Sequence, residues 1–231
     1  KTRKMFKAIY NAVSGNEITQ KYDVEPQHCA TGGHRFLWKI FNATHKKSRV
    51  PVSIFLFDKE DPAIKSMGKT QKEALLESFR KDVAALKQFS LAKPAPNPNI
   101  LRLFQTFEET KKELAFVSER VVFSLANALG HTENLSEVAA LGQLNSSTKE
   151  LMNDPHISSL EATRGVAQVL EALQFGVVGG GSSKGRRKLH LDVGPHNIYL
   201  TSDGQWRLAG WGFSLELDVN DASTLCPYFM H

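Results

Sequence analysis

The sequence lacks the features that mark secreted, membrane-spanning and fibrous proteins. Its 231 residues include only two cysteines, Cys29 and Cys226, which lie far apart and cannot form a disulfide framework or a zinc site. No apolar run approaches the roughly eighteen residues of a membrane span. Lys1–Tyr10 alternates basic and hydrophobic residues and has no signal-peptide core. We therefore expect a globular protein in a reducing, cytoplasmic compartment.

The composition is ordinary for a globular chain and mildly basic. Hydrophobic residues make up 41% and charged residues 23%, which excludes a disordered, collagen-like or coiled-coil chain. The 29 basic and 24 acidic residues give a net charge of +5, concentrated partly in residues 1–7 and 184–188. This excess permits peripheral contact with an anionic membrane, but a solvated tail and a solvated loop explain it more simply. Nucleic acid is not an expected partner.

Periodicity divides the chain into three regions. Residues 1–20 form a basic appendage in which Phe6, Ile9, Tyr10 and Val13 share one helical face. Residues 21–119 are expected to form a compact lobe of five strands and one helix. The strands are predicted at 24–29, 36–43, 50–57, 100–107 and 114–119, and the helix at 70–89.

Residues 120–231 are more helical. We predict a short helix over 125–129 and a longer one over 157–175, with two short strands at 198–201 and 206–209. The longer helix should face the core through apolar residues at three- and four-residue steps: Ile157, Leu160, Val166, Val169, Leu170 and Leu173. A glycine-rich basic loop, 179–188, precedes the strands.

Two glycine-rich segments are candidates for phosphate sites. Gly180 and Gly185 have the spacing of a P-loop, but Arg186 and Arg187 follow where lysine and a hydroxyl residue are needed. Residues 30–36 join two strands, which is the layout of the protein-kinase phosphate loop, although only Gly32 fits that glycine pattern. By itself this second signal is weak.

However, several short motifs occur in the same order along this chain as in a protein kinase. Residues 52–55 stand at the position of Val-Ala-Ile-Lys, Asp82 at that of the pairing glutamate, and residues 97–100 resemble the His-Pro-Asn-Ile turn. Residues 189–198 match the catalytic loop at His190, Asp192, Pro195 and Asn197, and residues 210–212 replace Asp-Phe-Gly. The chain resembles a protein-kinase domain.

Further segments resemble the Scy-like pseudokinases, most closely the branch associated with clathrin-coated vesicles. These segments are residues 31–33, 38–42, 55–59 and 124–130. The resemblance implies a two-lobed α+β fold with a five-stranded antiparallel N-lobe, helix C and an incomplete helical C-lobe within a longer chain. It also implies a cytoplasmic scaffold at Golgi, endosome or coated-vesicle membranes, with clathrin or adaptor proteins as partners.

The same resemblance indicates where the chemistry fails. Phe55 replaces the phosphate-binding lysine, Gly210 replaces the metal-binding aspartate, and Gly194 replaces the catalytic-loop lysine. Asp192 and Asn197 remain as vestigial catalytic residues, which we expect to pin their own loop. A degenerate nucleotide cleft is outlined by Gly32, Gly33, Phe55, Glu119 and Gly210. We expect no metal or cofactor, with ATP and Mg²⁺ possible only if this cleft still binds them.

Packing residues of the kinase fold are retained. Leu86, His190 and Trp211 occupy positions that resemble the hydrophobic column between the lobes. Without its lysine partner, Asp82 is expected to be a surface residue of its helix. The leading hypothesis is a non-catalytic scaffold. The alternatives are a residual ATP-binding serine/threonine kinase that uses Asp192, Asn197 and Arg35, and lipid or nucleic-acid binding through residues 184–188.

Overall fold

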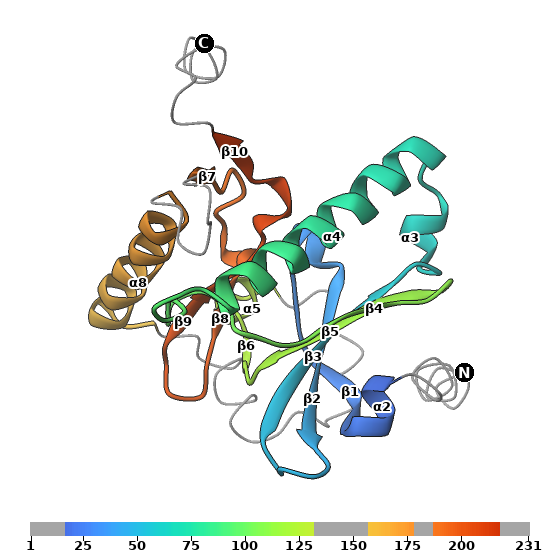
Figure 1. Cartoon of the computed structure of the whole chain (residues 1–231), viewed down its shortest axis with the longest axis horizontal. Coiled ribbons are helices and arrows are strands. Elements are labelled where there is room, and N and C mark those ends of the chain that lie inside the picture. Colours follow the sequence, from blue (N-terminus) through green and yellow to red (C-terminus); the bar gives the residue numbers. More distant parts are fainter. Residues whose placement is uncertain (1–16, 132–156, 178–186, 218–231) are drawn as a thin grey trace.

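The computed structural model describes residues 17–131, 157–177 and 187–217, which form a sheet-rich lobe and a smaller mixed lobe (Figure 1). The first lobe contains α2 (Glu17–Lys21), β1 (Tyr22–Gly32), η1 (His34–Phe36), β2 (Trp38–His45), β3 (Pro51–Asp58), α3 (Pro62–Lys65), α4 (Lys69–Ser90), β4 (Leu103–Glu109) and β5 (Glu113–Glu119). The second contains β6 (Phe123–Ser124), α5 (Leu125–Ala128), α8 (Ser159–Val177), β7 (Arg187–Leu189), η3 (Pro195–Asn197), β8 (Ile198–Leu200), β9 (Trp206–Leu208), η4 (Trp211–Phe213) and β10 (Leu215–Leu217).

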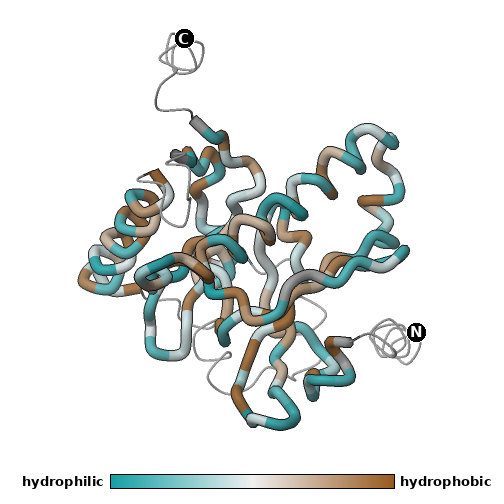
Figure 2. The backbone as a smooth tube through the Cα atoms, viewed as in Figure 1, coloured by the Kyte–Doolittle hydropathy of each residue, from teal (hydrophilic) through white to brown (hydrophobic). Residues whose placement is uncertain are grey.

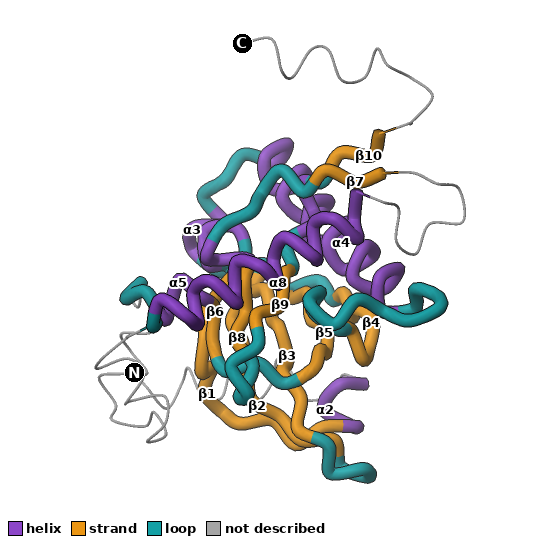
Figure 3. Tube along the Cα trace, turned by 90° about the vertical axis from the view of Figure 1, so that its left-hand side faces the viewer, coloured by secondary structure: helices purple, strands orange, loops and turns teal. Residues whose placement is uncertain are grey.

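The first lobe is built on an antiparallel sheet with strand order β1-β2-β3-β5-β4. Alternate side chains of its central strands enter two separate apolar clusters, as the two-residue period of a strand requires. The larger cluster joins Phe55 and Phe116 of the sheet to Phe79 of α4, which runs across this face (Figure 3). The smaller cluster includes Ile18 of α2. The sheet is therefore buried on both sides.

The second lobe is joined to the first by backbone hydrogen bonds. Leu101 N donates to Leu208 O at 3.0 Å, and Leu208 N donates to Asn99 O at 2.8 Å. Within this lobe β6, β8 and β9 form one small sheet, and β7 pairs with β10. These bonds fix the loop before β4 against β9.

Helix α8 approaches its neighbours through small residues. A Cβ atom at Gly165 would overlap the Trp206 ring, and one at Gly176 would overlap Trp211. The buried residues of the helix are Gly165, Val169, Ala172 and Gly176. The two glycines thus let two tryptophan rings lie directly against the helix backbone.

The predicted fold class is confirmed, since the described residues form a partial kinase-like α+β fold with an antiparallel N-lobe. Two predicted strands begin two or three residues later than expected. β2 starts at Trp38, because residues 34–36 form a 3₁₀ turn in which Arg35 has a φ of 56°, and β4 starts at Leu103 rather than at residue 100. The amphipathic segment 1–13, the basic residues 184–186 and Cys226 lie outside the described residues.

The face that we predicted for α8 is only partly right, because Ile157, Val169 and Leu173 pack against the core but the other three residues do not. Leu160, Val166 and Leu170 are exposed, with 79%, 52% and 60% of their surface accessible, and only Val169 of the predicted apolar set is fully buried. Apolar and polar residues are mixed along this helix in Figure 2. The hydrophobic period predicted the helix correctly. The face that packs against the second lobe is set by Gly165 and Gly176, which leave room for the rings of Trp206 and Trp211.

The described helices were also compared with the requirements of a membrane span. Within residues 17–131, 157–177 and 187–217, no helix has both the length and the apolar character needed to cross a bilayer.

Candidate functional site

The candidate site is the space between the lobes where a kinase would hold nucleotide. Its lining comes from the glycine turn after β1, from α4, from the catalytic-loop segment 190–197 and from the segment 210–213: Gly33, His34, Trp38, Ser78, Phe79, Asp82, Asp192, Asn197, Gly210, Gly212 and Phe213. The cavity that remains is only about 10 Å³, which is room for about one water molecule. Small-molecule sites usually occupy about 300–1,000 Å³. The lobes are closed onto each other.

Phe55 is at the centre of this closure. Its ring stacks on Phe116 with centroids 4.6 Å apart and meets Tyr199 edge-on at 5.1 Å. Phe55 and Tyr199 are each 1% exposed. Since Phe55 comes from β3 and Tyr199 from β8, the contact joins the two lobes through aromatic rings where the resemblance places an ammonium group.

Tyr199 is a residue of this site that the sequence analysis missed. A Cβ atom at Gly32 would lie 2.6 Å from the Tyr199 hydroxyl oxygen, so the ring lies directly under the glycine turn. Burial raises the pKa of the Tyr199 hydroxyl well above its usual value. The signal that could have found it is an aromatic residue two places after Asn197, on the strand that follows the catalytic-loop segment.

The glycine turn is tied to the second lobe by hydrogen bonds. Gly33 N donates to His196 O at 2.8 Å. Thr31 N donates to Asn127 Oδ1 at 3.0 Å, and Asn127 Nδ2 donates to Thr31 Oγ1 at 3.2 Å. A phosphate-binding turn needs free backbone N–H groups to donate to phosphate oxygens. In this structure two of those groups already have protein acceptors.

Asp192 and Asn197 are brought together, and they bind each other. Asn197 Nδ2 donates to the main-chain oxygen and to Oδ2 of Asp192, both at 2.8 Å. His196 Nε2 lies 3.4 Å from Asp192 Oδ1. The arrangement fits the expectation that these residues pin their own loop.

Gly210 is adjacent to the same amide. It has a φ of 82°, in the left-handed region, and a Cβ atom on it would overlap the Asn197 side chain. A carboxylate at this position would need both a strained backbone and a displaced Asn197. Among the residues that the structure describes, no group of three or more His, Cys, Asp or Glu side chains could hold a metal ion.

Asp82 is not the surface residue that we expected. It is 6% exposed, and its Oδ1 accepts hydrogen bonds from Gly210 N at 3.0 Å and Trp211 N at 2.8 Å. Burial raises the pKa of this carboxyl to about 7, against the opposing effect of the two N–H groups. The backbone of the segment 210–211 replaces a lysine as the partner of this helix residue.

The predicted packing column is buried. Leu86, His190 and Trp211 are 0%, 3% and 0% exposed, and the His190 and Trp211 ring centroids lie 4.5 Å apart. Asp192 N donates to His190 Nδ1 at 3.2 Å, so Nε2 carries the hydrogen that it donates to Ala209 O at 2.8 Å. Burial lowers the pKa of His190, which favours this neutral form.

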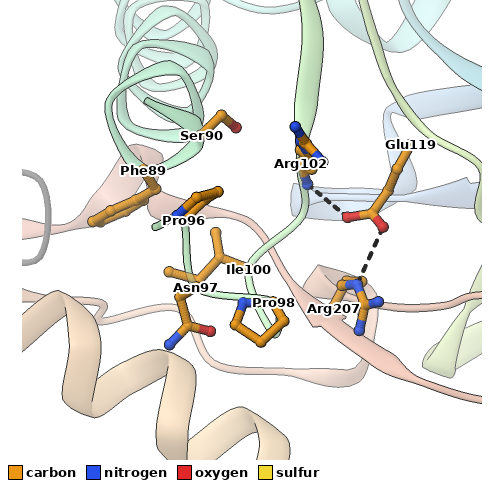
Figure 4. A pocket seen from close by; sticks show the side chains of 9 residues that line it. All are labelled: Phe89, Ser90, Pro96, Asn97, Pro98, Ile100, Arg102, Glu119 and Arg207. Atoms are coloured by element: carbon orange, nitrogen blue, oxygen red, sulfur yellow. Dashed lines mark hydrogen bonds and ion pairs between the residues drawn. The ribbon is translucent and has the colours of Figure 1, made fainter. Parts of the chain in front are cut away.

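The predicted cleft residues do not all line the same space. Gly33 and Gly210 line the small cavity with Asp192 and Asn197, whereas Gly32 and Phe55 are packed against Tyr199 behind it. Glu119 faces a different pocket, where Oε1 accepts a hydrogen bond from Arg102 N and Oε2 lies 3.3 Å from Arg207 Nε (Figure 4).

Comparison with known proteins gives related sequences but no matching family model. SCY1-like protein 2 of Mus musculus and that of Homo sapiens are each 32% identical to this chain over 205 residues, which cover 89% of it. Protein kinase-like protein SCY1 of Saccharomyces cerevisiae is 26% identical over 212 residues. The chain spans 20% of the length of the two SCY1-like proteins and 24% of the yeast protein.

Proposed function

Because this chain belongs to the Scy-like family of protein-kinase-like proteins, we propose that its kinase-like domain is a pseudokinase that works as a binding scaffold. The observation that carries the proposal is the packing of Phe55 against Tyr199, with a ring-to-ring distance of 5.1 Å. Two apolar side chains from opposite lobes take up the space that a nucleotide would need.

Phosphoryl transfer depends on positioning and electrostatics rather than on covalent chemistry by the protein. It needs a cation on the phosphates, a carboxylate on magnesium and a base near the accepting hydroxyl. Phe55 supplies no cation, and Gly210 supplies no ligand atom. Asp192 could act as a base, but its Oδ2 accepts a hydrogen bond from Asn197 Nδ2. Removing several groups that act together can lower turnover by several orders of magnitude.

A thermal-unfolding titration with ATP and MgCl₂ tests the proposal, with an active protein kinase domain as the positive control. A nucleotide at about 100 times its Kd would stabilise the fold by about 2.7 kcal/mol. That gain corresponds to a rise in Tm of roughly 5–10 °C for a chain of this size. We expect no saturable rise at sub-millimolar ATP, and such a rise would refute the loss of nucleotide binding.

The alternative is a residual kinase, and the retained pair of Asp192 and Asn197 is the observation that favours it. Incubation with radiolabelled ATP at high protein concentration separates the two functions. We expect no label on the chain or on a generic substrate protein. Labelling that disappears in Asp192→Asn would establish the residual kinase instead.

We further propose that the scaffold acts in coat-mediated vesicle traffic on the cytoplasmic face of Golgi, endosome or coated-vesicle membranes, with clathrin or its adaptors as partners. The support is the family resemblance together with a framework that stays packed around a filled cleft. The test is co-sedimentation of the purified chain with coated vesicles before and after the coat is stripped. Retention on stripped vesicles at an unchanged level would argue against a coat partner.

A further inference from the structure

A second, larger pocket lies between the end of α4, the loop that precedes β4, and β9 (Figure 4). Its volume is about 230 Å³. The lining residues are Phe89, Ser90, Pro96, Asn97, Pro98, Ile100, Arg102, Glu119 and Arg207. None of them lines the small cavity between the lobes. This pocket can therefore be tested independently of nucleotide binding.

The loop that forms one wall is held in place. Asn97 Oδ1 accepts a hydrogen bond from Asn99 N at 2.8 Å, and Asn99 Nδ2 donates to Glu171 Oε2 of α8 at 2.6 Å. The hydrogen bond from Leu101 N to Leu208 O fixes the far end of the loop. A pocket with a fixed wall binds a ligand without first having to order that wall.

The polar side of the pocket carries an excess of positive charge. Both oxygens of Glu119 are engaged, one by Arg102 N and the other by the Arg207 guanidinium. Arg207 is thereby neutralised. Within the part of the chain that the structure describes, no carboxylate pairs with the exposed guanidinium of Arg102, which lies 5.7 Å from the centre of the Phe104 ring.

The remaining lining offers apolar contact and few acceptors. Pro96 and Pro98 present their rings, and the buried side chains of Phe89 and Ile100, which are 2% and 3% exposed, lie behind them (Figure 4). The Ser90 hydroxyl already accepts a hydrogen bond from a main-chain N–H group. A ligand that fits must bring its own acceptor, preferably an anionic one, next to an apolar group.

From this geometry we propose that the pocket is a docking site for an acidic peptide segment of a partner protein. A glutamate or aspartate side chain pairs with Arg102, whose planar guanidinium can hold a carboxylate through two parallel hydrogen bonds. A neighbouring apolar side chain of the peptide packs on Pro96 and Pro98, which are the accessible apolar residues of the lining. The volume suits one or two side chains rather than a whole cofactor, since cofactor and drug-sized sites begin at about 300 Å³.

The test is selection of a random peptide phage library on the purified chain. Arg102→Gln removes the charge at an exposed side chain for which the structure shows no ion pair, so the fold should be retained. Lys111→Gln, in the exposed turn between β4 and β5, is the matched control because it lowers the net charge equally outside the pocket. Tm values of all three proteins confirm that they are folded.

We expect the wild-type chain and Lys111→Gln to select the same consensus, with an acidic residue beside an apolar one. Arg102→Gln should lose it, and the synthetic consensus peptide should bind this variant at least about tenfold more weakly in fluorescence anisotropy. The proposal is overturned by no consensus, by a consensus without acidic residues, or by one that Arg102→Gln retains. Displacement of the peptide by equal concentrations of free acetate would show a small-anion site instead of a peptide site.

Discussion

The side-chain amide of Asn197 occupies the space that any side chain at position 210 would need. Gly210 has a φ of 82°, and Asn197 is fixed by two hydrogen bonds to Asp192. The packing around position 210 therefore leaves no room for a carboxylate side chain unless Asn197 moves. Restoring an aspartate there would not by itself restore a metal site.

Gly210→Ala should destabilise the protein more than Gly204→Ala. Both glycines have left-handed backbones, with φ values of 82° and 73°, but a Cβ atom at Gly204 meets nothing within 4 Å. Each alanine pays a backbone cost of about 1–2 kcal/mol, and at position 210 overpacking adds about 1–3 kcal/mol. Urea unfolding measures the difference. Equal losses would mean that Asn197 moves aside freely.

Phe55→Lys should not recover nucleotide binding and should cost far more stability than Phe55→Leu. The ammonium group would be buried among Trp38, Phe116 and Tyr199. An unpaired buried charge costs about 3 kcal/mol or more, whereas the leucine variant should lose about 1 kcal/mol. The readouts are the free energy of unfolding and the Tm with ATP and MgCl₂. Equal stability of the two variants, or a nucleotide-dependent rise in Tm for Phe55→Lys, would show that the cleft opens readily.

Gly32 and Tyr199 should be energetically coupled. Gly32→Ala places a methyl group 2.6 Å from the Tyr199 ring and should cost about 1–3 kcal/mol. In a Tyr199→Leu background the same change should cost less, with a coupling energy of about 1 kcal/mol. Gly68→Ala, whose Cβ would have only one neighbour at 3.8 Å, is the control and should show no coupling to Tyr199→Leu. Additive costs for Gly32→Ala would contradict the close contact.

The buried carboxyl of Asp82 should make stability depend on pH. Its folded-state pKa is raised from 3.8 to about 7, so the folded protein keeps a proton that the unfolded chain releases between these values. The free energy of unfolding should therefore fall as the pH rises from about 4 to 7, by an amount of the order of a few kcal/mol.

Asp82→Asn isolates this effect. Asparagine keeps an acceptor for Gly210 N and Trp211 N and cannot ionise, so its unfolding free energy should fall less between pH 5 and 7.5. The comparison between the two proteins matters because burial also raises the pKa of Glu113 to about 7 in both. Parallel pH profiles would exclude a raised pKa at Asp82.

The sequence predicted most of the elements because local periodicity reports them. The strands of the first sheet and helices α4 and α8 appear close to their predicted ranges. Periodicity was only partly right about the orientation of α8, where Val169 is buried as predicted but Leu170 is exposed and Gly165 is buried. A hydrophobic stripe shows which side chains of a helix could be buried. In α8 the buried face is set instead by Gly165, which lets the Trp206 ring contact the helix backbone.

The candidate site was only partly predictable for a similar reason. The order of motifs located Phe55, Asp192, Asn197 and Gly210, because each stands at a fixed distance from its neighbours in the chain. It did not locate Tyr199, and it placed Asp82 on the surface. Both depend on what faces them from the other lobe.

The sequence alone thus determined the kinase-like order of elements and placed Phe55 and Gly210 where the family resemblance expects a lysine and a metal-binding aspartate, since residue identity is a property of single positions. Only the tertiary structure decided which residues contact Phe55 and Asp82. Phe55 meets Tyr199, and the backbone of Gly210 and Trp211 satisfies Asp82 across 128 and 129 residues of chain. These partners are selected by close packing and by the free-energy cost of burying an unpaired carboxylate. Both effects depend on residues that only the fold brings together.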